Sequence, residues 1–153
     1  MSKISLSPNA SGTGTFTLAS PDGNTNRTIN LPDAGGVLTA IDVYTEVTSA
    51  SNAVSVDCAV GGTFSHTLTE NTTFTFDNPP ASGTAYAMTV EIIQDASASG
   101  YTVTWPSSVD FPAATAPTLI ATAYAVDVFV FTTRDGGTNW YGFTAGQAIA
   151  TPV

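Results

Sequence analysis

Apolar and polar side chains alternate along most of this chain from Asn52 onward, and this period of two constrains the fold more than any other feature. Val54, Val56, Cys58 and Val60 share one parity and are expected to share one face, and residues 86–92 repeat the pattern with Tyr, Met, Val and Ile. Because successive side chains of a strand point to opposite faces, such alternation is typical of half-buried β-strands. The chain is therefore expected to consist of short strands around a common core.

The shortage of charged residues favours the same fold class. Only 10% of the 153 residues are charged, and Lys3, Arg27 and Arg134 are the only basic ones. Exposed helices usually depend on Glu, Lys and Arg for solubility and for i,i+4 pairing. An all-β fold is predicted, and 153 residues suit one compact domain with an appendage.

The charge balance restricts the partners of the chain. Its formal net charge is −9, whereas nucleic acids and anionic membranes are bound by Lys and Arg side chains, so we expect no nucleic acid and no membrane among the partners. No segment approaches the ~20 apolar residues of a membrane span, and residues 1–10 contain no apolar run of the length expected of a signal peptide. Cys58 is the single cysteine, which excludes an intramolecular disulfide framework.

Turn signals divide the second part of the chain into strands. Gly61-Gly62 predicts a tight hairpin leading into Thr63 to Thr69, and Asp135-Gly136-Gly137 predicts another. The three prolines between Trp105 and Pro117 predict an extended, irregular crossover. Six or seven short strands indicate an antiparallel β-sandwich of the jelly-roll kind over residues 53–153, although a barrel would have the same pattern.

Residues 1–40 differ from the rest, because their apolar side chains are too few for a core of their own. They are predicted to form an extended β arm that is ordered by neighbouring molecules, followed by a connector over residues 41–52 that has room for a helical turn. The candidate assembly and attachment residues of the arm are Phe16, Leu18, Arg27, Ile29, Leu31, Val37 and Leu38.

Aromatic side chains supply the second candidate site. Residues 124–132 are apolar on both parities, with three valines on one side and Phe129 and Phe131 on the other, so both faces of this strand are expected to be covered. Two roles are open for the aromatic side chains: a subunit interface or ligand platform, or packing in the core. The residues concerned are Trp105, Phe111, Phe129, Phe131, Trp140 and Tyr141.

Two sequence patterns resemble the fibre and surface proteins of tailed bacteriophages. In the arm, S-P-x-x-x-T-N-R-T ends at Thr28 and Leu31-Pro32-Asp33 follows; in the second part, the Asp127–Phe131 strand precedes Asp135-Gly136-Gly137 and Trp140-Tyr141-Gly142. The resemblance also includes Trp105-Pro106 and Phe111-Pro112. It implies a homotrimer of β-structure, assembled on a capsid or a tail.

Signals for catalysis are sparse. His66 is the only histidine and is in phase with Phe64 and Leu68, as expected of a hydrogen-bonded residue of the core; Cys58 is likewise in phase with its apolar neighbours. No nucleophile motif accompanies these two residues. Paired carboxylates of a glycosidase are conceivable among twelve acidic residues, but no pattern singles out a pair.

One spacing suggests a metal. Asp22, Asn24, Asn26 and Asp33 fall at positions one, three, five and twelve of a calcium loop, but Arg27 stands where that loop needs glycine, so a turn between strands is the preferred interpretation. No cofactor and no metal are predicted.

These observations favour a non-enzymatic phage structural protein, made in the host cytoplasm and located in the virion. The leading hypothesis is a trimeric capsid decoration (cement) or head-fibre protein that binds the major capsid protein or other virion proteins through residues 1–40. The alternative is a tail-fibre module that recognises a host cell-surface glycan.

Overall fold

The fold is that of a computed structural model that describes Ser11 and residues 43–150. This part of the chain is almost entirely β-structure, so the all-β prediction is confirmed for it. The residue names and bounds are β1 Tyr44–Glu46, β2 Ala53–Asp57, β3 Thr63–Thr67, β4 Thr72–Asp77, β5 Tyr86–Ile93, β6 Val103–Thr104, β7 Val109–Asp110, a 3-10 turn Pro112–Ala114, β8 Val126–Thr133 and β9 Trp140–Ile149.

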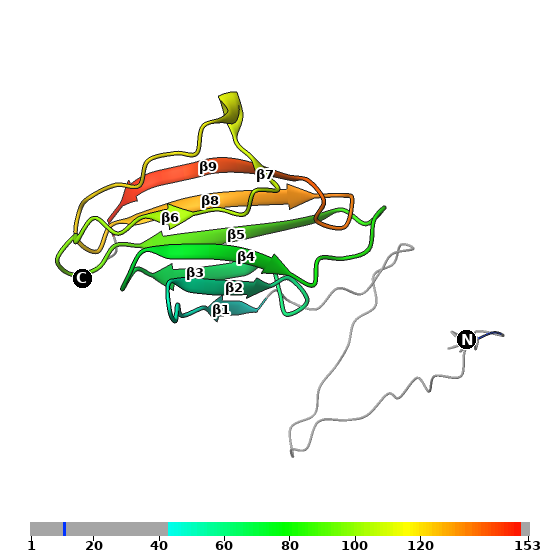
Figure 1. Ribbon diagram of the computed structural model, residues 1–153, viewed down its shortest axis with the longest axis horizontal. Coiled ribbons are helices and arrows are strands. Elements are labelled where there is room, and N and C mark those ends of the chain that lie inside the picture. Colours follow the sequence, from blue (N-terminus) through cyan, green and yellow to red (C-terminus); the bar gives the residue numbers. More distant parts are fainter. Residues whose placement is uncertain (1–10, 12–42, 151–153) are drawn as a thin grey trace, which may run out of the picture. The chain divides into compact units, whose positions relative to one another are not determined.

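The strands form two sheets, and the chain alternates between them. One sheet has the order β1-β3-β5-β8-β9-β7 and the other has the order β2-β4-β6. Figure 1 shows the smaller sheet lying over the larger one. From β1 to β6 each successive strand therefore belongs to the opposite sheet, and the chain winds as a two-layered coil.

Parallel pairing follows from this winding. Tyr44 of β1 pairs with Thr63 of β3, and Thr63 pairs in turn with Thr89 of β5, always in parallel. In the smaller sheet β2 pairs in parallel with β4, and β4 with β6. Parallel neighbours need a crossover between them, and here a strand of the opposite sheet provides it.

The prediction of antiparallel pairing is wrong for most of the described strands. Among the seven pairings of residues 43–150 only β5 with β8 and β8 with β9 are antiparallel. Gly61-Gly62 closes no hairpin either, because β2 and β3 belong to different sheets. The physical reason is the backbone: tight hairpin turns need positive φ angles, which Gly61 and Gly62 lack and Gly136 and Gly137 have, at +74° and +79°.

The second hairpin is confirmed. Asp135 organises it: its carboxylate accepts hydrogen bonds from the Asn139 backbone N–H at 3.0 Å and from the Thr133 hydroxyl at 3.0 Å. Gly137 is required for a further reason, since a Cβ there would lie 2.8 Å from the Pro79 side chain. This turn leads β8 directly into β9.

The core lies between the two sheets and is built largely of aromatic rings. Phe76 of the smaller sheet has its ring centre 5.0 Å from that of Phe131 and 5.1 Å from that of Trp140, both on the larger sheet. The alternation correctly predicted the inward residues of β2 and β5, but it was wrong for Val60, which lies beyond the end of β2 and is 50% exposed. Buried members of the core are Val54, Val56, Cys58, Phe64, Leu68, Phe74, Met88, Val90, Ile92, Phe111, Phe129, Phe131 and Trp140.

The first strand lies inside the segment that was expected to be a connector. Within residues 41–52, β1 pairs with β3, and the hydroxyl groups of Tyr44 and Ser65 are hydrogen bonded at 2.6 Å. The β-branched residues that counted against a helix here are compatible with a strand. The predicted arm, residues 1–40, lies outside the described residues apart from Ser11, and so do all of its candidate assembly residues.

Candidate functional site

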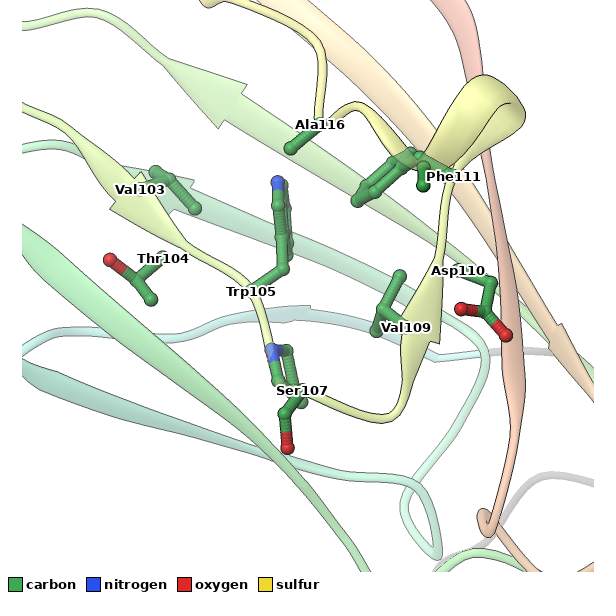
Figure 2. Close-up of a pocket in the computed structure, with 10 residues that line it drawn as sticks. Val103, Thr104, Trp105, Ser107, Val109, Asp110, Phe111 and Ala116 are labelled. Carbon is green, nitrogen blue, oxygen red and sulfur yellow. The ribbon is translucent and has the colours of Figure 1, made fainter.

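A cleft of about 390 Å³ opens beside Trp105, at the segment that was predicted to be an irregular crossover. β6, β7 and the 3-10 turn surround the cleft, and Figure 2 shows Trp105 and Phe111 on two sides of it. The 3-10 turn bulges because Ala113 and Ala114 both have positive φ angles, +56° and +52°. Most of the lining is apolar: Val103, Trp105, Pro106, Val109, Phe111 and Ala116.

Phe111 packs directly against Gly142, which has no side chain. A Cβ on Gly142 of β9 would lie 2.7 Å from Phe111 Cε1, closer than carbon atoms approach one another. Gly142 thus lets the Phe111 ring lie flat against the sheet, where it is 8% exposed. One wall of the cleft therefore depends on a glycine that is more than thirty residues away in sequence.

Trp105 is half-buried and lies between the cleft and the aromatic core. Its ring centre lies 4.9 Å from Phe74, 4.9 Å from Phe131 and 5.2 Å from Phe129. The indole N–H donates no hydrogen bond within the described part of the chain. These ring contacts fix the position of Trp105 at the cleft.

The polar residues around the cleft do not converge on it. In Figure 2 the carboxylate of Asp110 and the hydroxyl groups of Thr104 and Ser107 point away from the space between Trp105 and Phe111. Glycan sites usually combine an aromatic platform with several convergent polar groups. What the cleft provides is an apolar slot with one hydrogen-bond donor.

The structure places most of the predicted interface aromatics in the core of a single chain. Phe129 and Phe131 are fully buried and Trp140 is 1% exposed, so these rings have no surface left for a partner or a ligand. Tyr141 is the exception: it is 45% exposed and lies on the opposite face of β9 from Trp140.

A second apolar surface lies on the outside of the larger sheet. Val130 of β8 is directly opposite Phe143 of β9, and Thr132 is opposite Tyr141. We define the outer apolar face as Ile93, Val128, Val130, Tyr141 and Phe143, which point away from the core. Phe143 is 48% exposed. Phe143 was not among the predicted site residues, although it has the same parity as Tyr141 and the opposite parity to Trp140, which indicates an outward side chain.

A hollow of about 530 Å³ lies at one end of this face. Ala87, Thr132, Arg134 and Tyr141 contribute to its lining. Arg134 is the single basic residue of residues 43–150, which contain nine Asp and Glu residues. Arg134 is exposed, and its guanidinium forms no ion pair within this part of the chain.

His66 and Cys58 are buried and have local partners. His66 is 0% exposed, and its Nδ1 donates to the Val47 carbonyl oxygen over 2.8 Å. The Cys58 thiol is 3.9 Å from the Val56 carbonyl oxygen, and burial raises its pKa to about 11, helped by the negative charges of Asp57 and Asp77 and opposed by Tyr86. The expectation that His66 is a hydrogen-bonded residue of the core is confirmed. A thiol held neutral is a poor nucleophile.

Two carboxylates lie side by side where β2 and β4 end. Asp57 is in register with Asp77, and Asn78 donates a hydrogen bond to Asp57 at 3.0 Å. The hydrogen bonds from Asn78 and from the Ala59 backbone lower the pKa of Asp57. A glycosidase needs one carboxyl whose pKa is raised, and the pKa of Asp57 is shifted in the opposite direction.

Metal-binding groups are not gathered elsewhere in the described residues. Within residues 43–150 no three His, Cys, Asp or Glu side chains come close enough together to hold a metal ion. The calcium-like spacing from Asp22 to Asp33 lies outside the described residues.

Comparison with known protein families, with curated proteins and with solved structures finds no match to this chain. In the described part, no helix has the length and apolar character needed to cross a membrane.

Proposed function

We propose that this chain is a non-enzymatic structural protein of a tailed-phage particle, a trimeric capsid decoration or head-fibre protein whose N-terminal residues 1–40 attach it to the particle as an extended β arm. The resemblance of its motifs to phage fibre and surface proteins suggests the class. The observation that carries the proposal is that the first turn of the coil leaves two strand edges open.

Those edges belong to β1 and β2. Each is the terminal strand of its sheet and has only one neighbour among the described strands, β3 for β1 and β4 for β2. An open edge offers unpaired N–H and C=O groups to an extended segment of another chain. Both edges lie at the turn of the coil that residues 1–42 precede, which supports a role for this end in assembly.

The chemistry of the described residues is consistent with a structural role. The only histidine and the only cysteine of the chain are buried with partners of their own, and the pKa of Asp57 is lowered by its hydrogen bonds. Long-lived β-rich particles depend on shared burial and main-chain hydrogen bonding, which this architecture can supply.

The alternative is a tail-fibre module that binds a host cell-surface glycan. The observation in its favour is the unpartnered indole N–H of Trp105 at a cleft of about 390 Å³. The hydroxyl groups around the cleft point away from it, which counts against this alternative, so it ranks second.

Copy number in the particle tests the proposal. We expect quantitative mass spectrometry of purified particles to find this chain in hundreds of copies relative to the major capsid protein, and cryo-electron microscopy to place it over the capsid lattice. A few copies confined to the tail would favour the glycan-binding alternative, and its absence from purified particles would refute both.

A further inference from the structure

We infer that the outer apolar face of β5, β8 and β9 is the surface on which a second copy of this chain docks. The inference rests on the proposed function, since it names the surface that would hold the copies of an assembly together. It differs from the sequence-based expectation, in which the interface aromatics included four rings that are buried in one chain.

The outer apolar face exposes large apolar side chains. Phe143 and Tyr141 are 48% and 45% exposed, and Val128 and Val130 lie beside them on β8 without joining the buried core. Contiguous apolar surface of this kind is uncommon on monomers and usually marks an interaction site. In a strand whose inner face is filled by Phe129 and Phe131, valines on the outer face add nothing to the core.

The distribution of charge over the chain also favours contact at this face. The chain carries a net charge of −9, so two copies repel each other over most of their surfaces. Val130, Tyr141 and Phe143 form an uncharged part of the outer apolar face. Glu91 lies on the same face beside Val128, two residues before Ile93, and Arg134 lines the hollow beside Tyr141.

The guanidinium of Arg134 also favours a second copy as the partner. A guanidinium with no ion pair in the described part of its own chain is suited to a carboxylate from outside. A second copy supplies carboxylates, and one of them, Glu91, lies on the same face. One copy thus carries both partners of an intermolecular salt bridge, which favours another copy of this chain over an unrelated protein.

Sedimentation of the full-length protein over a range of concentrations tests this inference. We expect the unaltered chain to self-associate and Phe143→Lys to weaken the association by about 100-fold or more, as for a central interface aromatic. Tyr141→Lys is a second variant at an exposed position, in case the first misfolds. Val60→Lys is the matched control, because Val60 is 50% exposed but lies between β2 and β3; it should associate like the unaltered chain.

The charges provide a test of orientation. Arg134→Glu should weaken association, and adding Glu91→Lys to it should restore much of the loss, whereas the salt bridge would be absent if neither change had an effect. Circular dichroism and thermal unfolding confirm that each variant is folded.

Three results would overturn the inference: a monomeric unaltered chain at all concentrations, Phe143→Lys and Tyr141→Lys variants that fold and associate normally, or a control that dissociates as they do. None of these depends on where the chain sits in a particle. The copy number measured in particles therefore separates a failure of this interface from a failure of the proposed function.

Discussion

The ring of Phe131 lies 5.0 Å from the ring of Phe76, and this contact joins the two sheets. Phe131 also packs against Trp105 and Phe111, with ring centres at 4.9 Å and 6.0 Å. Phe131→Ala should therefore lower the free energy of unfolding by about 3–5 kcal/mol, the usual cost of deleting a buried aromatic ring. Chemical denaturation measures this change. Val60→Ala, at an exposed site, should stay within about 0.5 kcal/mol of the unaltered protein.

The close packing of Phe111 on Gly142 leads to a second prediction. Gly142→Ala places a Cβ against the Phe111 ring and should destabilise the fold by about 1–3 kcal/mol, as overpacking does. Combining it with Phe111→Ala should cost less than the sum of the two single changes, because the added methyl group then has room. Strictly additive effects in this double-mutant cycle would show that the two residues do not press on each other.

Cys58 should be unreactive in the folded protein. Burial raises its thiol pKa to about 11 from an ordinary value of 9.0, so iodoacetamide at neutral pH should modify it only after the protein is denatured. The raised pKa stabilises the fold below pH 9.0, and this stabilisation should decline as the pH rises towards about 11. Cys58→Ala should remove this alkaline dependence, and rapid alkylation of the native protein would contradict the assignment.

The Asp135 turn should make the stability of the fold depend on pH in the acidic range. Hydrogen bonds from Asn139, and further ones from Thr133, lower the Asp135 pKa below its ordinary value of 3.8. A lowered pKa stabilises the fold above that value, and the contribution is lost as the pH falls through the lowered pKa. Asp135→Asn should therefore lose less stability than the unaltered chain when the pH drops below about 4, measured by thermal unfolding. Asp110→Asn is the control, since the Asp110 carboxylate makes no hydrogen bond in the described part.

Removal of residues 1–40 tests the attachment role of the arm. Residues 39–153 form one compact unit, so the truncated chain should remain a soluble β-domain with an unchanged circular dichroism signal per residue of strand. It should no longer bind particles that lack the full-length chain, as measured by co-sedimentation. Binding equal to that of the intact chain would assign attachment to the domain instead.

Side-chain alternation predicted which residues face the core but could not predict which strands are neighbours. The inward positions of Val54, Val56 and Phe129 follow from the period of two. Pairing partners do not, because a parallel coil and an antiparallel sandwich bury the same parity of each strand. The two Gly-Gly turns look alike in sequence, and only the φ angles of Gly136 and Gly137 make one of them a hairpin.

For the candidate site residues too, parity along a strand could be predicted from the sequence, whereas contacts between strands could not. His66 was correctly placed in the core because it shares a parity with Phe64 and Leu68. The depth of Trp140 could not be predicted, since it depends on Phe76, which comes from the other sheet and more than sixty residues earlier. The exposure of Phe143 could not be predicted either, because it depends on whether another segment covers the outer face of β8 and β9, and none of the described residues does.

The winding of the chain also has an implication for how such proteins can change in length. Tyr44 and Thr63 occupy equivalent positions on successive turns, as do Ala53 and Thr73, so the first turn takes about twenty residues, whereas later turns are longer, as between Thr63 and Thr89. Duplicating or deleting that unit would leave the remaining turns stacked as before, with their rows of inward side chains still aligned. A protein built this way could be made longer or shorter by whole turns, without redesign of the β8–β9 end.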